Sequence, residues 1–163
     1  VAIGGGALEN VTTGYDNVVV GNYAGSTLTT TNFVTLVGRM AGQKINHTDA
    51  NHTVAIGYQA LHDLTSGQNN TAVGYRALAD LTTGDYNTAS GYKALYSNTA
   101  SNITAYGSFS LYSNTTGEYN TATGYESLYS NTTGENNTAT GYQALYSNTT
   151  GSENVAFGKK RDY

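Results

Sequence analysis

The sequence predicts an all-β protein, a parallel β-solenoid (β-roll) of about ten 17-residue coils. One phrase, Asn-Thr-Ala-Thr-Gly-Tyr, returns at a nearly fixed interval; each interval is rich in Gly, Asn and Thr; and its apolar residues form only short runs. A fixed period is the sequence signature of a repeat architecture. The other two observations favour stacked strands over stacked helices, because Gly, Asn, Thr and Ser are poor in helix interiors.

The repeats are counted from the glycine that closes each Val-Ala-Ile-Gly or Thr-Ala-Thr-Gly phrase, which we call the anchor glycine. Successive anchors are 17, 17, 19, 17, 17, 16, 17, 17 and 17 residues apart, so two residues are inserted after the third anchor. We expect one solenoid domain in residues 1–158. Within it, residues 1–56 form irregular coils rich in Val and Ile, and residues 57–158 form regular Gly-Tyr-x-Ala-Leu coils. Residues 159–163, which include Lys159-Lys160-Arg161, are expected to be a cap or the start of the next segment, and could form a basic patch for an anionic polymer.

Each coil is expected to hold two short strands and two corners. The first strand ends at the anchor, as in residues 53–57, where the residues are β-branched or small. The second strand ends at the Ala-Leu pair, and Thr-Thr-Gly supplies a turn. Stacked coils can pair each strand in parallel with its copy in the next coil, at about 4.8 Å per coil.

Stacking places equal positions of successive coils in columns. We expect an Ala column and a Leu column to form a thin core, and Asn side chains to form a hydrogen-bonded ladder at one corner. The anchors are expected at a corner that needs positive φ or close backbone approach, where a Cβ would clash. The Ala column is Ala55, Ala72, Ala89, Ala105, Ala122 and Ala139; the Leu column is Leu61, Leu78, Leu95, Leu111, Leu128 and Leu145; the ladder is Asn87, Asn120 and Asn137; and the structural corner glycines are Gly57, Gly74, Gly91, Gly107, Gly124 and Gly141.

Composition excludes several classes of protein. The net charge is -4 and 11% of residues are charged, so the chain lacks the basic stripe of a nucleic-acid binder. With no Cys, it has neither a disulfide framework nor a thiolate metal site. No apolar run approaches the roughly 20 residues that span a bilayer, so we expect no membrane insertion by this segment. Residue 1 falls inside a repeat, from which we expect the chain to be a fragment of a longer protein.

The hydrophobic core predicted for one chain is small. The chain has only three Phe, and many coils add only Ala and Leu to the inside, which is little burial against the cost of ordering each coil. We therefore expect association into a homotrimer of parallel chains around one axis. The residue before each anchor changes from apolar, as in Ile3 and Val20, to polar, as in Thr123 and Thr140. This change predicts that the contact between chains, or the coil cross-section, alters in residues 74–91.

The phrases Val-Ala-Ile-Gly at residues 1–4, Thr-Val-Ala-Ile-Gly at 53–57 and Asn-Val-Ala-Phe-Gly at 154–158 resemble the head repeats of trimeric autotransporter adhesins, the YadA-like group. The longer form, Asn-Thr-Ala-x-Gly-Tyr-x-Ala-Leu followed by Asn-Thr-Thr-Gly, is similar to repeats of phage-tail-fibre-like and mosaic trimeric adhesive fibres of bacteria. The resemblance covers residues 53–158 most closely. It implies a trimeric, left-handed parallel β-roll used in attachment, located outside the cell, at the cell surface or on a virion tail fibre.

Two tyrosine rows are expected to run along the rod. One follows the anchors and the other follows the Leu column. Stacked rings could protect the fibre and pack at its corners or between chains. Alternatively, the rings could present a row of contacts to sugars or cell-surface polymers, with Asn and Thr supplying hydrogen bonds. The first row is Tyr75, Tyr92, Tyr125 and Tyr142; the second, which supplies the candidate receptor-binding residues, is Tyr96, Tyr112, Tyr129 and Tyr146.

Catalysis needs different groups that converge on one point, and a repeating chain offers few such constellations. His47, Asp49 and His52 lie in the inserted segment, where a loop could offer them to Zn²⁺; a polar corner loop is the favoured interpretation. His62 and Asp63 could suggest an acid-base pair, but neighbours in a strand point to opposite faces. We therefore expect no enzyme activity and no cofactor.

These observations predict an extracellular structural and adhesive fibre segment that presents a repeated surface to a cell-surface or glycan receptor. Two alternatives remain. Threonine pairs such as Thr121/Thr123 and Thr138/Thr140 resemble the ice-binding arrays of some β-solenoid antifreeze proteins, and a self-assembling extracellular filament is also compatible. Asn114, Asn131 and Asn148 begin Asn-Thr-Thr sequons, which glycosylation or simple turn chemistry could explain.

Overall fold

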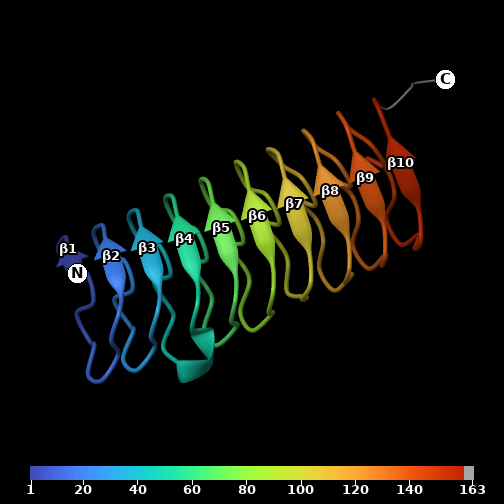
Figure 1. Cartoon of the computed structure of the whole chain (residues 1–163). Coiled ribbons are helices and arrows are strands. Elements are labelled where there is room, and N and C mark those ends of the chain that lie inside the picture. Colours follow the sequence, from blue (N-terminus) through green and yellow to red (C-terminus); the bar gives the residue numbers. More distant parts are fainter. Residues whose placement is uncertain (160–163) are drawn as a thin grey trace.

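The computed structural model describes residues 1–159 and shows a β-solenoid with one sheet of ten parallel strands, ordered as in the sequence (Figure 1). The predicted fold class is confirmed. Of the predicted C-terminal cap, only Lys159 falls among the described residues. The strands are β1 (Ala2–Ile3), β2 (Val18–Val20), β3 (Thr35–Val37), β4 (Val54–Ile56), β5 (Thr71–Val73), β6 (Thr88–Ser90), β7 (Thr104–Tyr106), β8 (Thr121–Thr123), β9 (Thr138–Thr140) and β10 (Val155–Phe157), and the 3-10 helix η1 is Thr48–Ala50.

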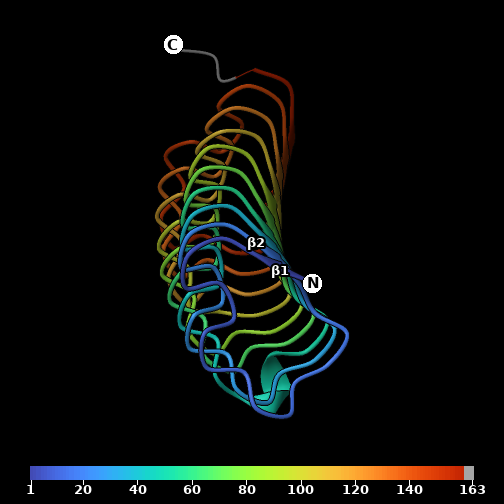
Figure 2. The ribbon, with the colours of Figure 1, turned by 90° about the vertical axis from the view of Figure 1, so that its left-hand side faces the viewer.

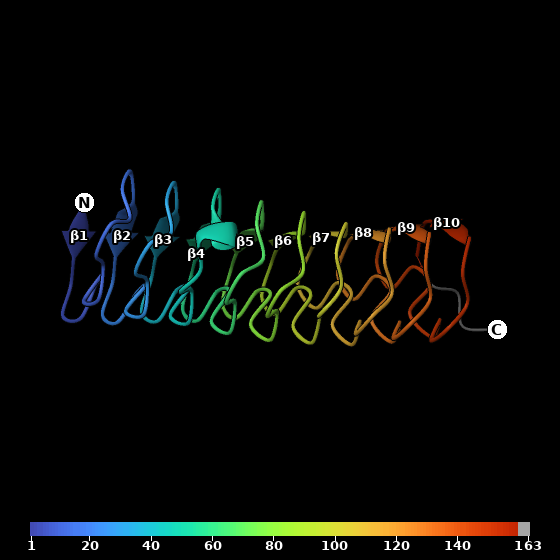
Figure 3. The ribbon, with the colours of Figure 1, turned by 90° about the horizontal axis from the view of Figure 1, so that it is seen from below.

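Equal positions of successive coils pair with each other along the whole sheet. Ala55 of β4 faces Ala72 of β5, which in turn faces Ala89 of β6. Figure 3 shows the strands side by side along the rod, one per coil. The strand register is the same across both the 19-residue and the 16-residue interval, because the length changes fall in a corner outside the strands. In Figure 2 the coils lie behind one another, and η1 marks the corner that takes up the two extra residues.

The coil holds one strand, and the second predicted strand is wrong. The segment that leads to each Ala-Leu pair is a turn, in which alternate residues such as Arg76 and Leu78 take positive φ values of 53° and 52°. This backbone still joins coils, because Arg76 N donates to Tyr58 O at 2.9 Å on one side while Leu78 N donates to Ala94 O at 3.0 Å on the other. Residue propensities predicted a strand here because most of the left-handed positions carry large side chains; at the position of Leu78, Gly occurs in two earlier coils, as Gly25 and Gly42.

The core follows the two predicted columns. All six residues of the Ala column and the first five of the Leu column are fully buried, and Leu145, in the final full coil, is partly buried. The anchor position is also as predicted. At Gly124, φ is 130° and an added Cβ would lie 2.5 Å from the carbonyl oxygen of Gly141. The close approach between stacked backbones therefore excludes any larger residue there.

The predicted asparagine column lies next to the strands, and Ile103 interrupts it between Asn87 and Asn120. Asn120 Oδ1 accepts from Asn137 N at 2.9 Å, and Asn120 Nδ2 donates to Gly134 O at 2.7 Å, which ties the strand side of one coil to the Thr-Thr-Gly corner of the next. Asn87 makes the equivalent bonds to Ile103 N and Ala100 O. These bonds satisfy backbone groups that a corner would otherwise leave unpaired.

A second buried ladder was not predicted. Leu64 and Leu81 fill one inner corner of their coils, but from Asn98 onward this position is asparagine. Asn98, Asn114 and Asn131 are fully buried, and Asn148 is partly buried. The change from Leu81 to Asn98 replaces an apolar corner with a polar one, so the interior alters between the coil that follows the fifth anchor, Gly74, and the coil that follows the sixth, Gly91. We call Asn98, Asn114, Asn131 and Asn148 the corner ladder.

The outer face of the sheet is exposed in the single chain. Its apolar side chains include Ile56, Val73 and Phe157, with exposed fractions of 40%, 37% and 76%. Strand alternation explains this exposure, because the central residue of each strand points inward and its two neighbours point outward. Within residues 1–159, no helix is long and apolar enough to cross a membrane.

Candidate ligand-binding surface

The four predicted receptor-binding residues come together as one stack of rings. We call Tyr96, Tyr112, Tyr129 and Tyr146 the corner row. Consecutive ring centroids are 5.5, 5.2 and 5.1 Å apart, with interplanar angles of 14°, 8° and 8°. All four side chains are half-buried. They follow the positive-φ leucine of each coil, so the turn that carries the core leucine also sets the position of the ring.

A second stack follows the anchors, and we call Tyr58, Tyr75, Tyr92, Tyr125 and Tyr142 the anchor row. Tyr75 stacks on Tyr92 at 5.0 Å, and Tyr125 stacks on Tyr142 at 5.5 Å. Ser108 interrupts the row, and Phe109 fills the gap with edge contacts to Tyr92 and Tyr125. Tyr75, Tyr92, Tyr125 and Tyr142 are 41–47% exposed, so this row is more accessible than the corner row.

Stacking decides which part of each ring can meet a ligand. An interior ring such as Tyr112 has a neighbour on each face, Tyr96 on one side and Tyr129 on the other. Sugars that pack on aromatic rings, and nucleic-acid bases, need an open face. The rows therefore present ring edges and hydroxyl groups at the interval of the coils, rather than stacking platforms.

Cations cover ring faces at the ends of the rows. The Arg39 guanidinium lies 5.7 Å from the centroid of Tyr58, and that of Arg76 lies 5.3 Å from Tyr96. Lys159 Nζ lies 5.6 Å from Tyr142 at the other end of the anchor row. Each contact is a cation–π interaction, worth about 0.5–1 kcal/mol at an exposed site.

A column of side chains runs between the two rows, and we call it the middle column. Phe109 contacts Tyr92 and Tyr125 of the anchor row and Tyr112 and Tyr129 of the corner row, which places it between them. Equivalent positions in other coils touch along the axis, as where Gln143 Nε2 donates to Glu126 Oε2 at 2.6 Å. The middle column is Met40, Gln59, Arg76, Lys93, Phe109, Glu126 and Gln143.

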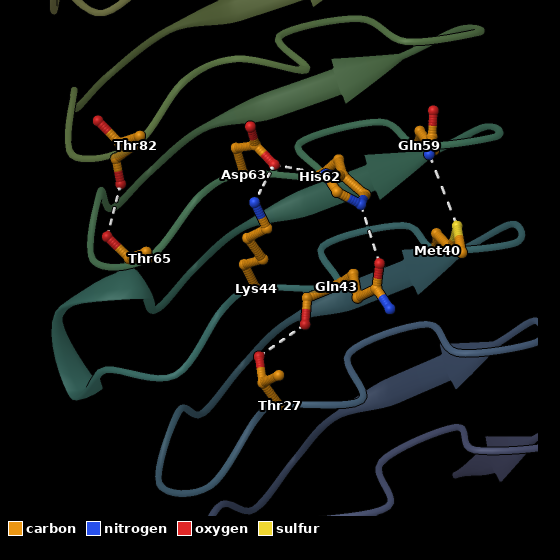
Figure 4. Close-up of polar contacts among 9 residues, drawn as sticks. All are labelled: Thr27, Met40, Gln43, Lys44, Gln59, His62, Asp63, Thr65 and Thr82. Atoms are coloured by element: carbon orange, nitrogen blue, oxygen red, sulfur yellow. Dashed lines mark hydrogen bonds and ion pairs between the residues drawn. The ribbon is translucent and has the colours of Figure 1, made fainter.

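The His62–Asp63 pair does form, contrary to the expectation that the two side chains point to opposite faces. His62 Nδ1 contacts Asp63 Oδ1, His62 Nε2 lies 2.9 Å from Gln43 Oε1, and Lys44 Nζ lies 2.9 Å from Asp63 Oδ1 (Figure 4). The strand rule failed because these residues follow the left-handed Leu61 in a turn. The result is a polar contact between two coils.

The charges of this cluster affect two carboxyl groups. Burial opposes ionisation of Asp63, but hydrogen bonds from Lys44 and His62 outweigh it and hold the Asp63 pKa below its ordinary value of 3.8. In the next coil, burial and then the Asp63 carboxylate raise the pKa of Asp80, while the Arg76 guanidinium partly offsets this.

The inserted segment does not gather its candidate zinc ligands. His47 Nδ1 accepts from Asp49 N at 3.2 Å and lies 3.2 Å from the Asp49 carboxylate. His52 instead stacks on Phe33 of the previous coil, with centroids 5.2 Å apart. Across residues 1–159, no three His, Cys, Asp or Glu side chains are grouped as metal ligands. This loop is a polar corner.

The threonine pairs of β8 and β9 and the Asn-Thr-Thr sequons have defined positions in the structure. Thr121, Thr123, Thr138 and Thr140 lie on the outer face of β8 and β9, between the exposed rings of Tyr106 and Phe157. Asn114 donates its two amide hydrogens to Asn98 Oδ1 and Gly117 O, both at 2.9 Å. Asn131 is bonded in the same way. A glycan on either amide nitrogen would replace one of these hydrogens, so glycosylation at either sequon is incompatible with the corner ladder.

The part of the chain that the structure describes contains no enclosed pocket, so any ligand would meet an open surface. No protein-family model, curated protein or solved structure matches this chain.

Proposed function

We propose that this chain is a structural and adhesive segment of an extracellular fibre, displayed at a cell surface or on a virion tail fibre. Its repeated surface binds a glycan or another cell-surface receptor, and it has no catalytic role. The observation that carries the proposal is the pair of tyrosine rows, which repeats one set of ring edges and hydroxyls along the rod. Tyrosine suits such a surface because it offers a large contact area for little lost side-chain entropy.

Multivalency explains how a surface without a pocket can bind. A single ring edge and hydroxyl would bind weakly, but a polymeric receptor can meet several coils at once. Each further contact is then intramolecular, so overall affinity rises without any strong single site. A rigid rod holds these contacts at fixed positions along its axis.

We further propose that the working form is a homotrimer whose chains meet through the outer face of the sheet. The exposed Ile56 and Val73 are apolar side chains on a flat strand surface, which burial would stabilise by roughly 25 cal/mol per Å² of apolar area. Association of three chains would also add buried apolar area to the small hydrophobic core of each coil. Light scattering should then give a mass near three times 17.1 kDa; a mass of one chain would contradict the trimer.

Glycan-array binding tests the adhesive function. We expect the chain to retain at least one glycan, and expect Tyr129→Ala and Tyr146→Ala to reduce that retention. Tyr119→Asn is the matched control, because Tyr119 is exposed outside both rows and Asn136 occupies the same position one coil later with a similar φ. If no glycan is retained, or if the control loses binding equally, the proposal is wrong.

A further inference from the structure

We propose that Arg76 and Lys93 form an anion-binding site in the middle column, and that its ligand is an extended acidic polysaccharide lying along the rod axis. This inference rests on the proposed adhesive function and specifies its ligand class. The two cations occupy the same position in adjacent coils, so their backbones are about 4.8 Å apart along the axis. Both charged groups lie against tyrosine rings, Arg76 over Tyr96 and Lys93 over Tyr92, Tyr96 and Tyr112.

The contacts of Lys93 place it among the rings. Its Nζ lies 5.7 Å from the centroid of Tyr92, 5.4 Å from Tyr96 and 6.0 Å from Tyr112. An ammonium group in this position touches both tyrosine rows. A carboxylate bound to it would therefore bring the rest of a sugar residue against ring edges and hydroxyls.

Neither cation is neutralised by an ion pair. The ion pairs formed within residues 1–159 have Lys44, His47 and His62 as their basic partners. Arg76 Nε is also buried without a hydrogen-bond partner, the one side-chain nitrogen or oxygen of this kind in the described chain. The Arg76 guanidinium partly offsets the rise in the pKa of the nearby Asp80, but the two side chains form no ion pair. Each cation lacks an ion-pair partner within residues 1–159, so an anion that binds there would neutralise a charge that the described chain leaves unpaired.

The shape of the surface favours a polymer that is parallel to the axis. The middle column and both rows run in that direction, and an extended 1,4-linked polysaccharide repeats its sugar residues at an interval comparable to one coil. Glu126 lies further along the same column and accepts from Gln143, so the positive section is confined to the coils of Arg76 and Lys93. The covered ring faces disfavour single-stranded nucleic acid, whose binding depends on bases stacking on open rings.

Binding of the full chain to β-1,4-linked polymannuronate tests the inference, with neutral β-1,4-mannan as the uncharged match. We expect polymannuronate to bind at least about tenfold more tightly than mannan, and its binding to weaken as salt is raised. Arg76→Gln and Lys93→Gln should each weaken polymannuronate binding about fivefold and leave mannan unaffected. Lys44→Gln removes the same charge outside the middle column, two coils before that of Arg76, and should change binding less than about twofold.

Folding of these variants can be anticipated from the chain itself. Gln59 and Gln143 occupy the same middle-column position with φ values of 53° and 54°, equal to those of Arg76 and Lys93 within 2°. Unchanged unfolding midpoints of the two glutamine variants would establish that a loss of binding is local.

The outcomes separate this inference from the proposed function. Equal binding of mannan and polymannuronate, full binding by both glutamine variants, or equal competition by poly(dT) would overturn the acidic-polysaccharide site. Retention of neutral glycans that depends on Tyr129 and Tyr146 would still support the adhesive function in each of those cases. Absence of binding to every glycan, acidic or neutral, would overturn both.

Discussion

Asn131 donates one amide hydrogen to Asn114 Oδ1 at 2.8 Å, and its Oδ1 accepts from Asn148 Nδ2 at 3.0 Å, so each amide of the corner ladder links two coils. The other hydrogen of Asn131 goes to Gly134 O at 2.9 Å. Asn98, Asn114 and Asn131 are fully buried, so water cannot replace a partner that one of them loses. A buried amide chain of this kind stabilises the fold only while every member is present.

The corner ladder predicts non-additive substitutions. Asn131→Leu leaves the buried Asn114 Oδ1 without its donor and removes one of the two acceptors of Asn148 Nδ2, which keeps Gly151 O. We therefore expect it to lower the free energy of unfolding by about 1–3 kcal/mol. Replacing Asn98, Asn114, Asn131 and Asn148 together by Leu restores the apolar corner seen at Leu64 and Leu81. The fourfold variant should therefore lose much less than four times the single effect in denaturant unfolding. Additive losses would show that the amides act independently.

Gly124→Ala tests the close approach at the anchors. The new Cβ would lie 2.5 Å from Gly141 O, and φ at this position is 130°. Because the obstacle is backbone, we expect a loss of about 2–4 kcal/mol in the free energy of unfolding, measured in guanidinium chloride. At Gly5, which lacks positive φ, the nearest atom to a Cβ is Asn22 Nδ2 at 3.3 Å. Gly5→Ala should therefore be nearly neutral, and equal losses at the two sites would contradict the stacking geometry.

Alkaline conditions should weaken the fold through the corner row. Burial and the neighbouring Tyr112 and Tyr146 raise the pKa of Tyr129 above its ordinary 10.0. The folded chain holds this proton more tightly than the unfolded chain, so the stabilisation is complete below about pH 10 and declines as pH rises through the folded pKa. Unfolding free energies at about pH 8 and pH 11 should show the decline. Tyr129→Phe removes this titration and should reduce the decline in unfolding free energy. An unchanged decline would show that other groups cause it.

The outer sheet face should control the number of chains. Val73→Glu places a charge on the apolar part of that face, so we expect the mass in light scattering to fall from three chains toward one. Thr123→Glu is the control on the same face, because β8 is polar there. Circular dichroism should show both variants folded, since both side chains point outward. A trimer that survives Val73→Glu would place the contact on another face.

The period, the core columns and the anchor corner could all be predicted, because each depends on a residue type that repeats with the coil. Ala55 and Ala72 recur because the interior is thin, and Gly124 recurs because backbones meet there. The second strand was mispredicted because residues such as Arg76 and Leu78 are not typical of left-handed backbone. Hydrogen bonds between stacked coils hold both residues in that conformation, and burial of the Leu78 side chain adds to them.

The candidate surface was predicted in part. The sequence placed Tyr96 and Tyr112 in one row, but ring stacking, which covers their faces, depends on the separation and tilt of the coils. The corner ladder had a signal that was overlooked: Leu64 and Leu81 give way to Asn98 and Asn114 at one unchanged position of the repeat. Arg76 and Lys93 differ from their counterparts in other coils, and their place between the rows requires the turn geometry.

Both departures from the regular period fall at one point of the coil. Thr48–Ala50 of η1 occupies the place where the 19-residue interval gains two residues, and the 16-residue interval loses one residue between Thr99 and Ala100. The strands on either side keep their register in both cases. This corner is consequently a natural site for grafting: a foreign peptide placed there in any chosen coil would be displayed at a selectable height along a rigid scaffold.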